Sequence, residues 1–190
     1  MPENMPKLEM IISEESLRAR VEELAAGVAA AMRGKDFVLV GVLKGSVVFL
    51  ADLMRALHRQ GLCPTVDFVT MSSYGEETQS SGRARILSGL HVGVEGKSVL
   101  LVDDIADTGL TLKQARDHVL SLGAREAFTC VLLDKPSRRT VDFGPDFHGF
   151  SIGDVFVVGY GLDAANRHRC LPYVARLADG AKTKDEIAPQ

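Results

Sequence analysis

Three aspartates, a glycine and two threonines stand together in VLLVDDIADTGLTL, residues 99–112. Asp103, Asp104 and Asp107 follow an apolar run typical of a buried strand, and the threonines open a segment with helical character. Backbone N–H groups at such a strand-to-helix turn bind phosphate, because a helix N-terminus carries partial positive charge. Two adjacent carboxylates would repel a nearby phosphate unless they bound Mg²⁺ or accepted hydrogen bonds from sugar hydroxyls. The stretch therefore predicts a site for a phosphorylated sugar.

Helix capping and an unrelated aspartate motif explain the 99–112 stretch less well than a phosphate site does, and a glycine motif further along the chain is also unlike its model. Capping of the following helix needs only one Asp or Thr. The Asp103-to-Asp107 spacing also fits the aspartate motif of prenyl-diphosphate enzymes, but those are all-helical and here the motif ends a strand. GYGLDA, residues 159–164, matches a dinucleotide-binding glycine pattern, but Pro172 follows where the helix of a βαβ unit would be needed.

The segments around the aspartates alternate between strand and helix patterns. Strands are expected at residues 37–43, 65–73, 98–104, 127–134 and 154–160, and helices at 13–34, 46–60 and 109–122. Runs that are apolar on both faces are typical of parallel strands covered by helices. The alternation predicts an α/β fold with a mainly parallel sheet. Residues 74–97 are polar and then rich in glycine, which predicts a loop followed by a short hairpin or edge strand.

Composition limits the possible partners and the cellular compartment. The 190 residues are 46% hydrophobic and 25% charged, enough for one domain with a substantial core. A net charge of −3 with no basic block argues against a nucleic-acid partner. No leader pattern or apolar run of membrane-spanning length occurs. The three cysteines have no CxxC spacing, which indicates reduced thiols. We therefore expect a cytoplasmic protein with no membrane partner.

The aspartate stretch resembles the phosphoribosyl-pyrophosphate (PRPP) signature of the type I phosphoribosyltransferases. Further stretches resemble the hypoxanthine-guanine branch of that family: VGVLKGSVVFLADL (40–53), SSYGEETQSSGRARIL (72–87), LLDKPSRR (132–139) and FVVGYGLD (156–163), with Arg169 beyond. The resemblance spans residues 8–178. It implies the type I fold, a mainly parallel twisted sheet flanked by helices with a small hood from the chain ends, and Mg²⁺ as cofactor.

The resemblance implies a role for each residue of the PRPP half of the site. Asp103 and Asp104 would hold the ribose hydroxyls and, directly or through water, Mg²⁺. The 5′-phosphate would be wrapped by Asp107, Thr108, Gly109, Leu110 and Thr111, with Asp107 also acting as general acid/base at the purine N7. Lys44 and Gly45 would form a pyrophosphate loop, with a non-proline cis peptide between Leu43 and Lys44. Arg169 would contact the pyrophosphate.

In the purine half, Lys135 follows an apolar strand, where its ammonium could donate to an exocyclic O6 atom. The resemblance implies that Phe156 stacks on the purine and that the carbonyls of Val157 and Asp163 accept from N1 and N2. Asp163 would also bind a second Mg²⁺ through the pyrophosphate. The alternatives are solvated side chains for Lys44 and Lys135, and core packing for Phe156.

Two segments are expected to be mobile. The resemblance implies that Ser73 and Tyr74 begin a lid, over about residues 73–84, that closes on the reaction centre and excludes water. The tail at residues 179–190 is expected to be disordered.

The activity implied is transfer of the 5-phosphoribosyl group from PRPP to hypoxanthine or guanine in purine salvage, by a homo-oligomer (a dimer or tetramer). A non-catalytic PRPP-binding regulator is the alternative, but it would be expected to carry a DNA-binding module or a basic face. An enzyme for adenine or a pyrimidine is disfavoured by Lys135, because an ammonium pairs with a 6-oxo acceptor and not with a 6-amino donor.

Overall fold

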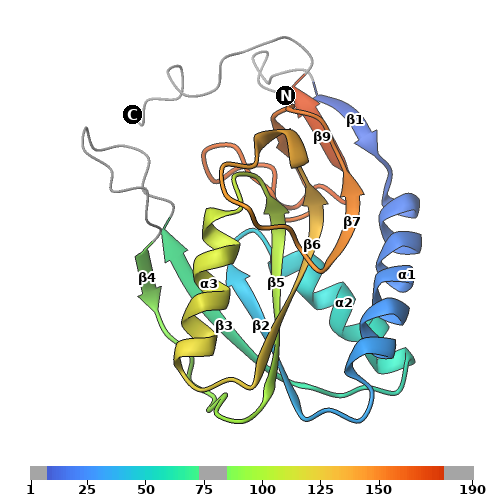
Figure 1. Cartoon of the computed structure of the whole chain (residues 1–190). Coiled ribbons are helices and arrows are strands. Elements are labelled where there is room, and N and C mark those ends of the chain that lie inside the picture. The colour runs from blue at the N-terminus through green and yellow to red at the C-terminus, as the bar shows by residue number, and fades with distance from the viewer. Residues whose placement is uncertain (1–7, 73–84, 178–190) are drawn as a thin grey trace.

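A six-stranded central sheet organises the computed structural model, which describes residues 8–72 and 85–177 (Figure 1). The strands lie in the order β4 (Arg85–Ser88), β3 (Thr65–Ser72), β2 (Phe37–Leu43), β5 (Ser98–Ala106), β6 (Glu126–Asp134) and β7 (Phe147–Ser151). All neighbouring pairs are parallel except β3 with β4, which is antiparallel. The expected α/β fold with a mainly parallel sheet is confirmed.

Helices cover both faces of this sheet. α1 (Glu14–Met32) and α2 (Val47–Arg59) lie on one face and α3 (Leu110–Ser121) on the other (Figure 1). Strand β5 shows the division, because Leu100 faces the cluster packed by α1 and α2 while Leu101 faces the cluster packed by α3. Both residues are fully buried, as expected of a strand between two layers of helix. In the described residues, no helix has the length and apolar composition of a membrane span.

The chain ends form a separate small sheet. β1 (Leu8–Ile12), β9 (Val174–Leu177) and β8 (Val157–Val158) pair antiparallel in the order β1-β9-β8. This sheet lies toward the carboxyl ends of the central strands (Figure 1). It is the expected hood.

One expected strand of the central sheet was wrong. Residues 154–160 do not form a fifth parallel strand, since only Val157–Val158 is extended and it pairs with β9 in the hood. The outer parallel strand is instead β7, FHGFS, beside β6. β7 is half-exposed at the sheet edge and so has little of the apolar pattern of an inner strand. Its Gly149 packs against the backbone of Leu132, where a Cβ would lie 2.5 Å from the carbonyl oxygen.

The parallel direction of the inner strands brings their carboxyl ends to one edge. β5 runs to Ala106, two residues further than expected, so Asp103 and Asp104 belong to the strand and Asp107 follows it. The end of β2 carries Lys44 and the end of β6 carries Lys135. Ligands of open α/β sheets bind at this edge, so the fold gathers residues from three segments of the chain. The 3₁₀ turn η1 (Pro136–Arg138) follows β6 directly.

Candidate active site

A cavity of about 470 Å³ opens at the carboxyl edge of the sheet. Most of the residues predicted for the PRPP half of the site line it: Gly45, Asp103, Asp104, Asp107, Thr108, Gly109 and Thr111. They come from the ends of β2 and β5 and from the start of α3. The residues predicted for the purine half, together with Lys44, Leu110 and Arg169, are not part of this lining.

The turn from β5 into α3 has the form of an anion site. Its N-cap residue is Gly109, which has a φ of 84° and no side chain with which to cap the helix. The left-handed backbone suits glycine, and a Cβ there would lie 2.7 Å from the Arg139 side chain. Since the Gly109 N-cap supplies no side-chain hydrogen bond to the first turn of α3, those N–H groups are suited to an anion. Among the side chains of the turn, Thr108 accepts the N–H of Leu110 through its hydroxyl at 3.4 Å.

Asp103 and Asp104 form a carboxylate pair with little access to water. Asp103 is 7% exposed, and one of its oxygens accepts the backbone N–H of Asp104 at 2.9 Å. Burial raises the pKa of Asp103 well above its ordinary range, and the charge of Asp104 adds to the rise. Burial also raises the pKa of Asp104, against a lowering by the nearby Arg169 charge. Even with Arg169 nearby, both carboxylates keep a raised pKa.

The Asp103 and Asp104 carboxylates are suitable ligands for a Mg²⁺ ion that would also be held by the substrate. Mg²⁺ prefers oxygen ligands and takes one or two protein carboxylates together with waters and substrate phosphates. No group of three candidate metal ligands occurs in residues 8–72 and 85–177, so Asp163 does not join the pair. Asp163 instead pairs with Arg169 at 2.7 Å and accepts the backbone N–H of Asn166 at 2.7 Å.

The loop after β2 packs tightly against the aspartates. A Cβ on Gly45 would lie 1.6 Å from a carboxylate oxygen of Asp104. The peptide between Leu43 and Lys44 is cis, as the resemblance implied. The side chain of Lys44 is exposed, and its backbone lies between Leu43 and Gly45, which both line the cavity.

Asp107 is held by two arginines to which the sequence motifs assigned no role. Arg138 donates to a carboxylate oxygen of Asp107 at 2.7 Å and also pairs with Asp154. Arg139 donates to the backbone carbonyl of Asp107 at 2.6 Å and pairs with the buried Asp134. The only signal in the sequence was the double arginine in LLDKPSRR, directly after Lys135.

Lys135 is not the solvated lysine, and Phe156 is not the core residue, that the alternative interpretations of the sequence predict. Lys135 is 6% exposed and its backbone N–H donates to the Ala106 carbonyl at 2.9 Å, so it is not a solvated loop lysine. In the described residues its ammonium makes no hydrogen bond or ion pair. Phe156 is 44% exposed, so it does not pack in the core, whereas the neighbouring Val157 is buried. Ser73 and Tyr74, with the lid expected at 73–84 and the tail at 179–190, lie outside the described residues.

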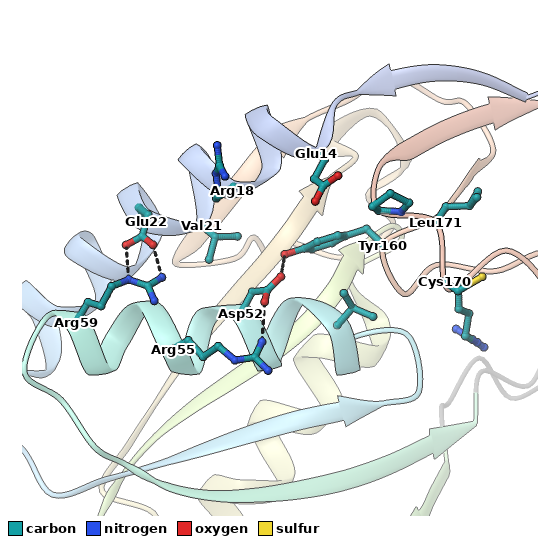
Figure 2. A pocket seen from close by; sticks show the side chains of 13 residues that line it. Glu14, Arg18, Val21, Glu22, Asp52, Arg55, Arg59, Tyr160, Cys170 and Leu171 are labelled. Atoms are coloured by element: carbon teal, nitrogen blue, oxygen red, sulfur yellow. Dashed lines mark hydrogen bonds and ion pairs between the residues drawn. The ribbon is translucent and has the colours of Figure 1, made fainter.

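A larger cavity, of about 660 Å³, lies between α1, α2 and residues 160–172 (Figure 2). Its lining includes Asp52, Tyr160 and Arg169 but neither the aspartate pair nor the phosphate turn. The residues predicted to bind phosphate and ribose line the smaller cavity, which we therefore take as the candidate active site.

Similarity to known proteins identifies the family of this chain. Residues 9–165 match the family model described as phosphoribosyl transferase domain. The chain belongs to the phosphoribosyltransferase family. It is 46% identical to a hypoxanthine-guanine phosphoribosyltransferase of Aquifex aeolicus (strain VF5), over 91% of this chain and 96% of that protein. It is 44% identical to a hypoxanthine phosphoribosyltransferase of Escherichia coli (strain K12), over 90% and 95%.

The solved structures of this family agree in fold. The crystal structure of a hypoxanthine-guanine phosphoribosyltransferase from Bacillus anthracis superposes with a TM-score of 0.84 at 42% identity, over 90% of this chain and 99% of that one. The resemblance stated from the sequence motifs is thereby confirmed, and so is the phosphoribosyltransferase fold.

Proposed function

We propose that this phosphoribosyltransferase transfers the 5-phosphoribosyl group of PRPP to hypoxanthine or guanine, giving IMP or GMP and pyrophosphate, as a step of purine salvage. The observation that carries the proposal is the meeting of three features at one sheet edge. These are the Asp103 and Asp104 carboxylate pair, the phosphate turn at 107–111, and Lys135, a residue that is 6% exposed at the end of β6. The enzyme names of the relatives favour catalysis over a PRPP-binding regulator.

Each feature has a role in the proposed reaction. The N–H groups of the 107–111 turn bind the 5′-phosphate, and Asp103 and Asp104 hold the ribose hydroxyls. The Mg²⁺ bound by this pair, directly or through water, would neutralise the pyrophosphate leaving group. Lys44 and Gly45 bind the pyrophosphate through their backbone, and Arg169 adds positive charge. Most of the rate enhancement then comes from orientation and electrostatics.

Asp107 accepts a proton from the purine in the proposed reaction. As the bond from C1′ to pyrophosphate breaks and the bond from C1′ to the purine N9 forms, the purine must lose one proton. Arg138 donates to Oδ1 of Asp107, which leaves Oδ2 to accept that proton at N7. Arg138 thus holds the carboxylate in place while one oxygen faces the base.

The purine half supplies selectivity. Lys135 donates to O6, Phe156 stacks on the ring, and the carbonyls of Val157 and Asp163 accept from N1 and N2. An ammonium in a buried setting favours a 6-oxo acceptor over a 6-amino donor, since two facing donors would both lose hydrogen bonds to water. Asp163 would bind a second Mg²⁺ through pyrophosphate.

We also propose a homo-oligomer (dimer or tetramer) in the cytoplasm. Val47 on α2 and Phe68 on β3 are 45% and 39% exposed and give apolar surface to a second copy. We infer a single domain, with Ser73 and Tyr74 beginning a lid over 73–84. Sedimentation of the purified protein tests the oligomer, and suppression by PRPP of protease cleavage within 73–84 tests the lid.

The direct test of the function is a product assay. Purified protein with PRPP, Mg²⁺ and hypoxanthine should form IMP and pyrophosphate in equal amounts, and EDTA should stop the reaction. Ribose 5-phosphate in place of PRPP should give no IMP, because it has no pyrophosphate to lose. Tight binding of PRPP without IMP or GMP would instead support the regulator.

A further inference from the structure

A hydrogen bond outside the active-site cavity joins helix α2 to the turn at residues 159–163. The hydroxyl of Tyr160 donates to a carboxylate oxygen of Asp52 at 2.6 Å (Figure 2). Tyr160 is 6% exposed. Asp52 keeps contact with solvent, and its other oxygen accepts from Arg55 at 2.9 Å. The phenol is therefore buried with a partner whose own charge stays hydrated.

The turn that carries Tyr160 has an uncommon backbone. Gly159, Tyr160 and Gly161 have φ values of 97°, 50° and 101°, so three consecutive residues lie in the left-handed region. That region is unfavourable for a residue with a Cβ, so outside contacts must hold Tyr160 there. The backbone N–H groups of Tyr160 and Gly161 donate to the carbonyls of Leu171 and Arg169, both at 2.9 Å. The hydrogen bond from the Tyr160 side chain to Asp52 also ties the turn to helix α2.

The same turn packs directly on the proposed pyrophosphate loop. A Cβ on Gly161 would lie 2.1 Å from the carbonyl oxygen of Gly45, and a Cβ on Gly45 would lie 1.6 Å from the Asp104 carboxylate. The two backbones and the carboxylate are thus stacked with no room for a methyl group. A shift of the 159–163 turn would change the position of Gly45 relative to Asp104.

The turn also connects both halves of the proposed site. Val157 precedes it and Asp163 ends it, and Arg169 donates to the Gly161 carbonyl at 2.6 Å. Helix α2, which begins at Val47 after the pyrophosphate loop, carries Asp52 on its second turn. The hydrogen bond from Tyr160 to Asp52 therefore closes a ring that runs from the loop through α2 to the turn and back to Gly45.

We propose that Tyr160 and Asp52 are positioning residues, whose hydrogen bond holds the 159–163 turn against Gly45 and so sets the geometry of the pyrophosphate half of the site. The inference rests on the proposed roles of Gly45 and Arg169 in binding pyrophosphate. Neither Tyr160 nor Asp52 contacts a reacting atom in the proposed reaction.

The Tyr160→Phe variant tests the bond, because it removes only the hydroxyl. We expect the KM values for PRPP and, in the reverse direction, for pyrophosphate to rise about tenfold, with kcat reduced much less. The dissociation constant for PRPP, measured by calorimetry, should rise by a similar factor. The KM for hypoxanthine should change less, since Lys135 and Phe156 lie outside the turn.

Variants of Asp52 separate positioning from simple removal of a side chain. Asp52→Asn keeps a hydrogen-bond acceptor and should retain near-normal KM for PRPP, whereas Asp52→Ala should match Tyr160→Phe. The double variant Asp52→Ala with Tyr160→Phe should be no worse than either single change, because both remove the same contact. If Asp52→Ala does not fold, Tyr160→Phe and Asp52→Asn carry the test.

Two control variants match the test in chemistry and in place. Tyr173→Phe removes a hydroxyl that makes no hydrogen bond within residues 8–72 and 85–177. Arg55→Ala removes the other partner of Asp52 without touching the turn. Both should leave the KM for PRPP unchanged.

The outcomes distinguish this inference from the proposed function. Loss of thermal stability in Tyr160→Phe with an unchanged KM and dissociation constant for PRPP would mean that the bond is only structural, and would overturn the inference. Absence of IMP or GMP formation by the unaltered protein would overturn the proposed function. The effect of Tyr160→Phe on PRPP binding would still decide the inference.

Discussion

At the scale of single residues, Asp107 joins the phosphate turn to the proposed proton transfer. Its backbone carbonyl is held by Arg139 and one carboxylate oxygen by Arg138. Both arginines are about thirty residues later in the chain, and the η1 turn after Lys135 brings them back. Such long-range pairs cannot be inferred from the local pattern, which is why the sequence motif identified Asp107 without its partners.

Replacement of Asp107 by Asn tests its role as a base. Asn keeps the size and much of the hydrogen bonding of Asp but cannot accept a proton, so kcat should fall by roughly 10² to 10⁴. PRPP binding, measured by calorimetry, should change little. Arg138→Ala is the matched control, since it breaks the ion pair but keeps the carboxylate, and its kcat should fall much less. Unchanged turnover in Asp107→Asn would reduce the residue to part of the phosphate turn.

Burial was the residue property hardest to predict. Lys135 follows an apolar strand in a polar loop, and its pattern fitted a solvated lysine as well as a ligand. Phe156 lies among valines and fitted a core position. The structure agrees with neither alternative, because Phe156 precedes β8 of the hood and is 44% exposed, while Lys135 is buried and its backbone N–H donates to the Ala106 carbonyl at the end of β5.

Among the elements, the inner strands and the three helices were predictable because each carries apolar residues at the spacing of its own secondary structure. Ser13, where the predicted helix at 13–34 begins, accepts the N–H of Ser16 at 3.2 Å and caps α1. The error at 154–160 arose because a run of apolar residues does not reveal which sheet it joins. β7 was missed because an edge strand needs only one buried face.

A buried carboxylate on β3 links two elements and gives a test of stability. Asp67 is 6% exposed and accepts the backbone N–H groups of Phe68, His91 and Val92 at 2.6 to 2.8 Å. Burial acts to raise its pKa, but these hydrogen bonds outweigh burial and lower it below the ordinary value. The segment before β5 is thereby fixed to the edge of the sheet.

The lowered pKa sets the sign of the pH dependence. The folded state binds a proton at Asp67 less readily than the unfolded chain, so this carboxylate stabilises the fold above the ordinary pKa, and that stability is lost as pH falls through the folded value. Asp67→Asn should lower the free energy of unfolding at pH 7 by about 1 to 3 kcal/mol, with a smaller difference below about pH 3.8. Urea unfolding at both pH values measures this. The exposed Asp142→Asn should show no such change, and equal stability of Asp67→Asn and the unaltered protein at pH 7 would refute the assignment.

At the scale of the whole molecule, the active site is a source of instability. Burial, and then the charge of Asp104, raise the pKa of Asp103, so the folded protein tends to keep a proton that the unfolded chain releases. As pH rises from the ordinary pKa of an aspartate through the folded value, the pair therefore costs stability. Mg²⁺ would offset this cost by compensating both charges.

Asp103→Asn should therefore increase stability while abolishing activity. Without Mg²⁺, its melting temperature should exceed that of the unaltered protein at pH 8, and the difference should vanish toward pH 4. Mg²⁺ with pyrophosphate should raise the melting temperature of the unaltered protein more than that of the variant. Thermal denaturation across this pH range measures both effects. A lower melting temperature for Asp103→Asn at pH 8 would show that the negative charges of Asp103 and Asp104 do not destabilise the folded protein.

The arrangement of the site was predictable at this scale for a simple reason. In a parallel sheet every inner strand ends at one edge, so the residues after 37–43, 98–104 and 127–134 had to meet. The hood was implied only by the family resemblance, because β1 and β9 are short and lie at opposite ends of the chain. The contact of the 159–163 turn with Gly45 depends on backbone packing that no residue pattern records.

We expect this phosphoribosyltransferase to use 6-oxopurines and to select them through donation from Lys135 to O6. The most direct measurement compares kcat/KM for hypoxanthine and adenine in the unaltered protein, in Lys135→Ala and in Lys113→Ala, an exposed lysine on α3 as control. We expect adenine to be rejected by several powers of ten, because it would set an amino donor against the Lys135 ammonium. Lys135→Ala should lose activity with hypoxanthine without a comparable gain with adenine, while Lys113→Ala should change neither. Equal use of adenine and hypoxanthine, or unaltered hypoxanthine kinetics in Lys135→Ala, would contradict the claim.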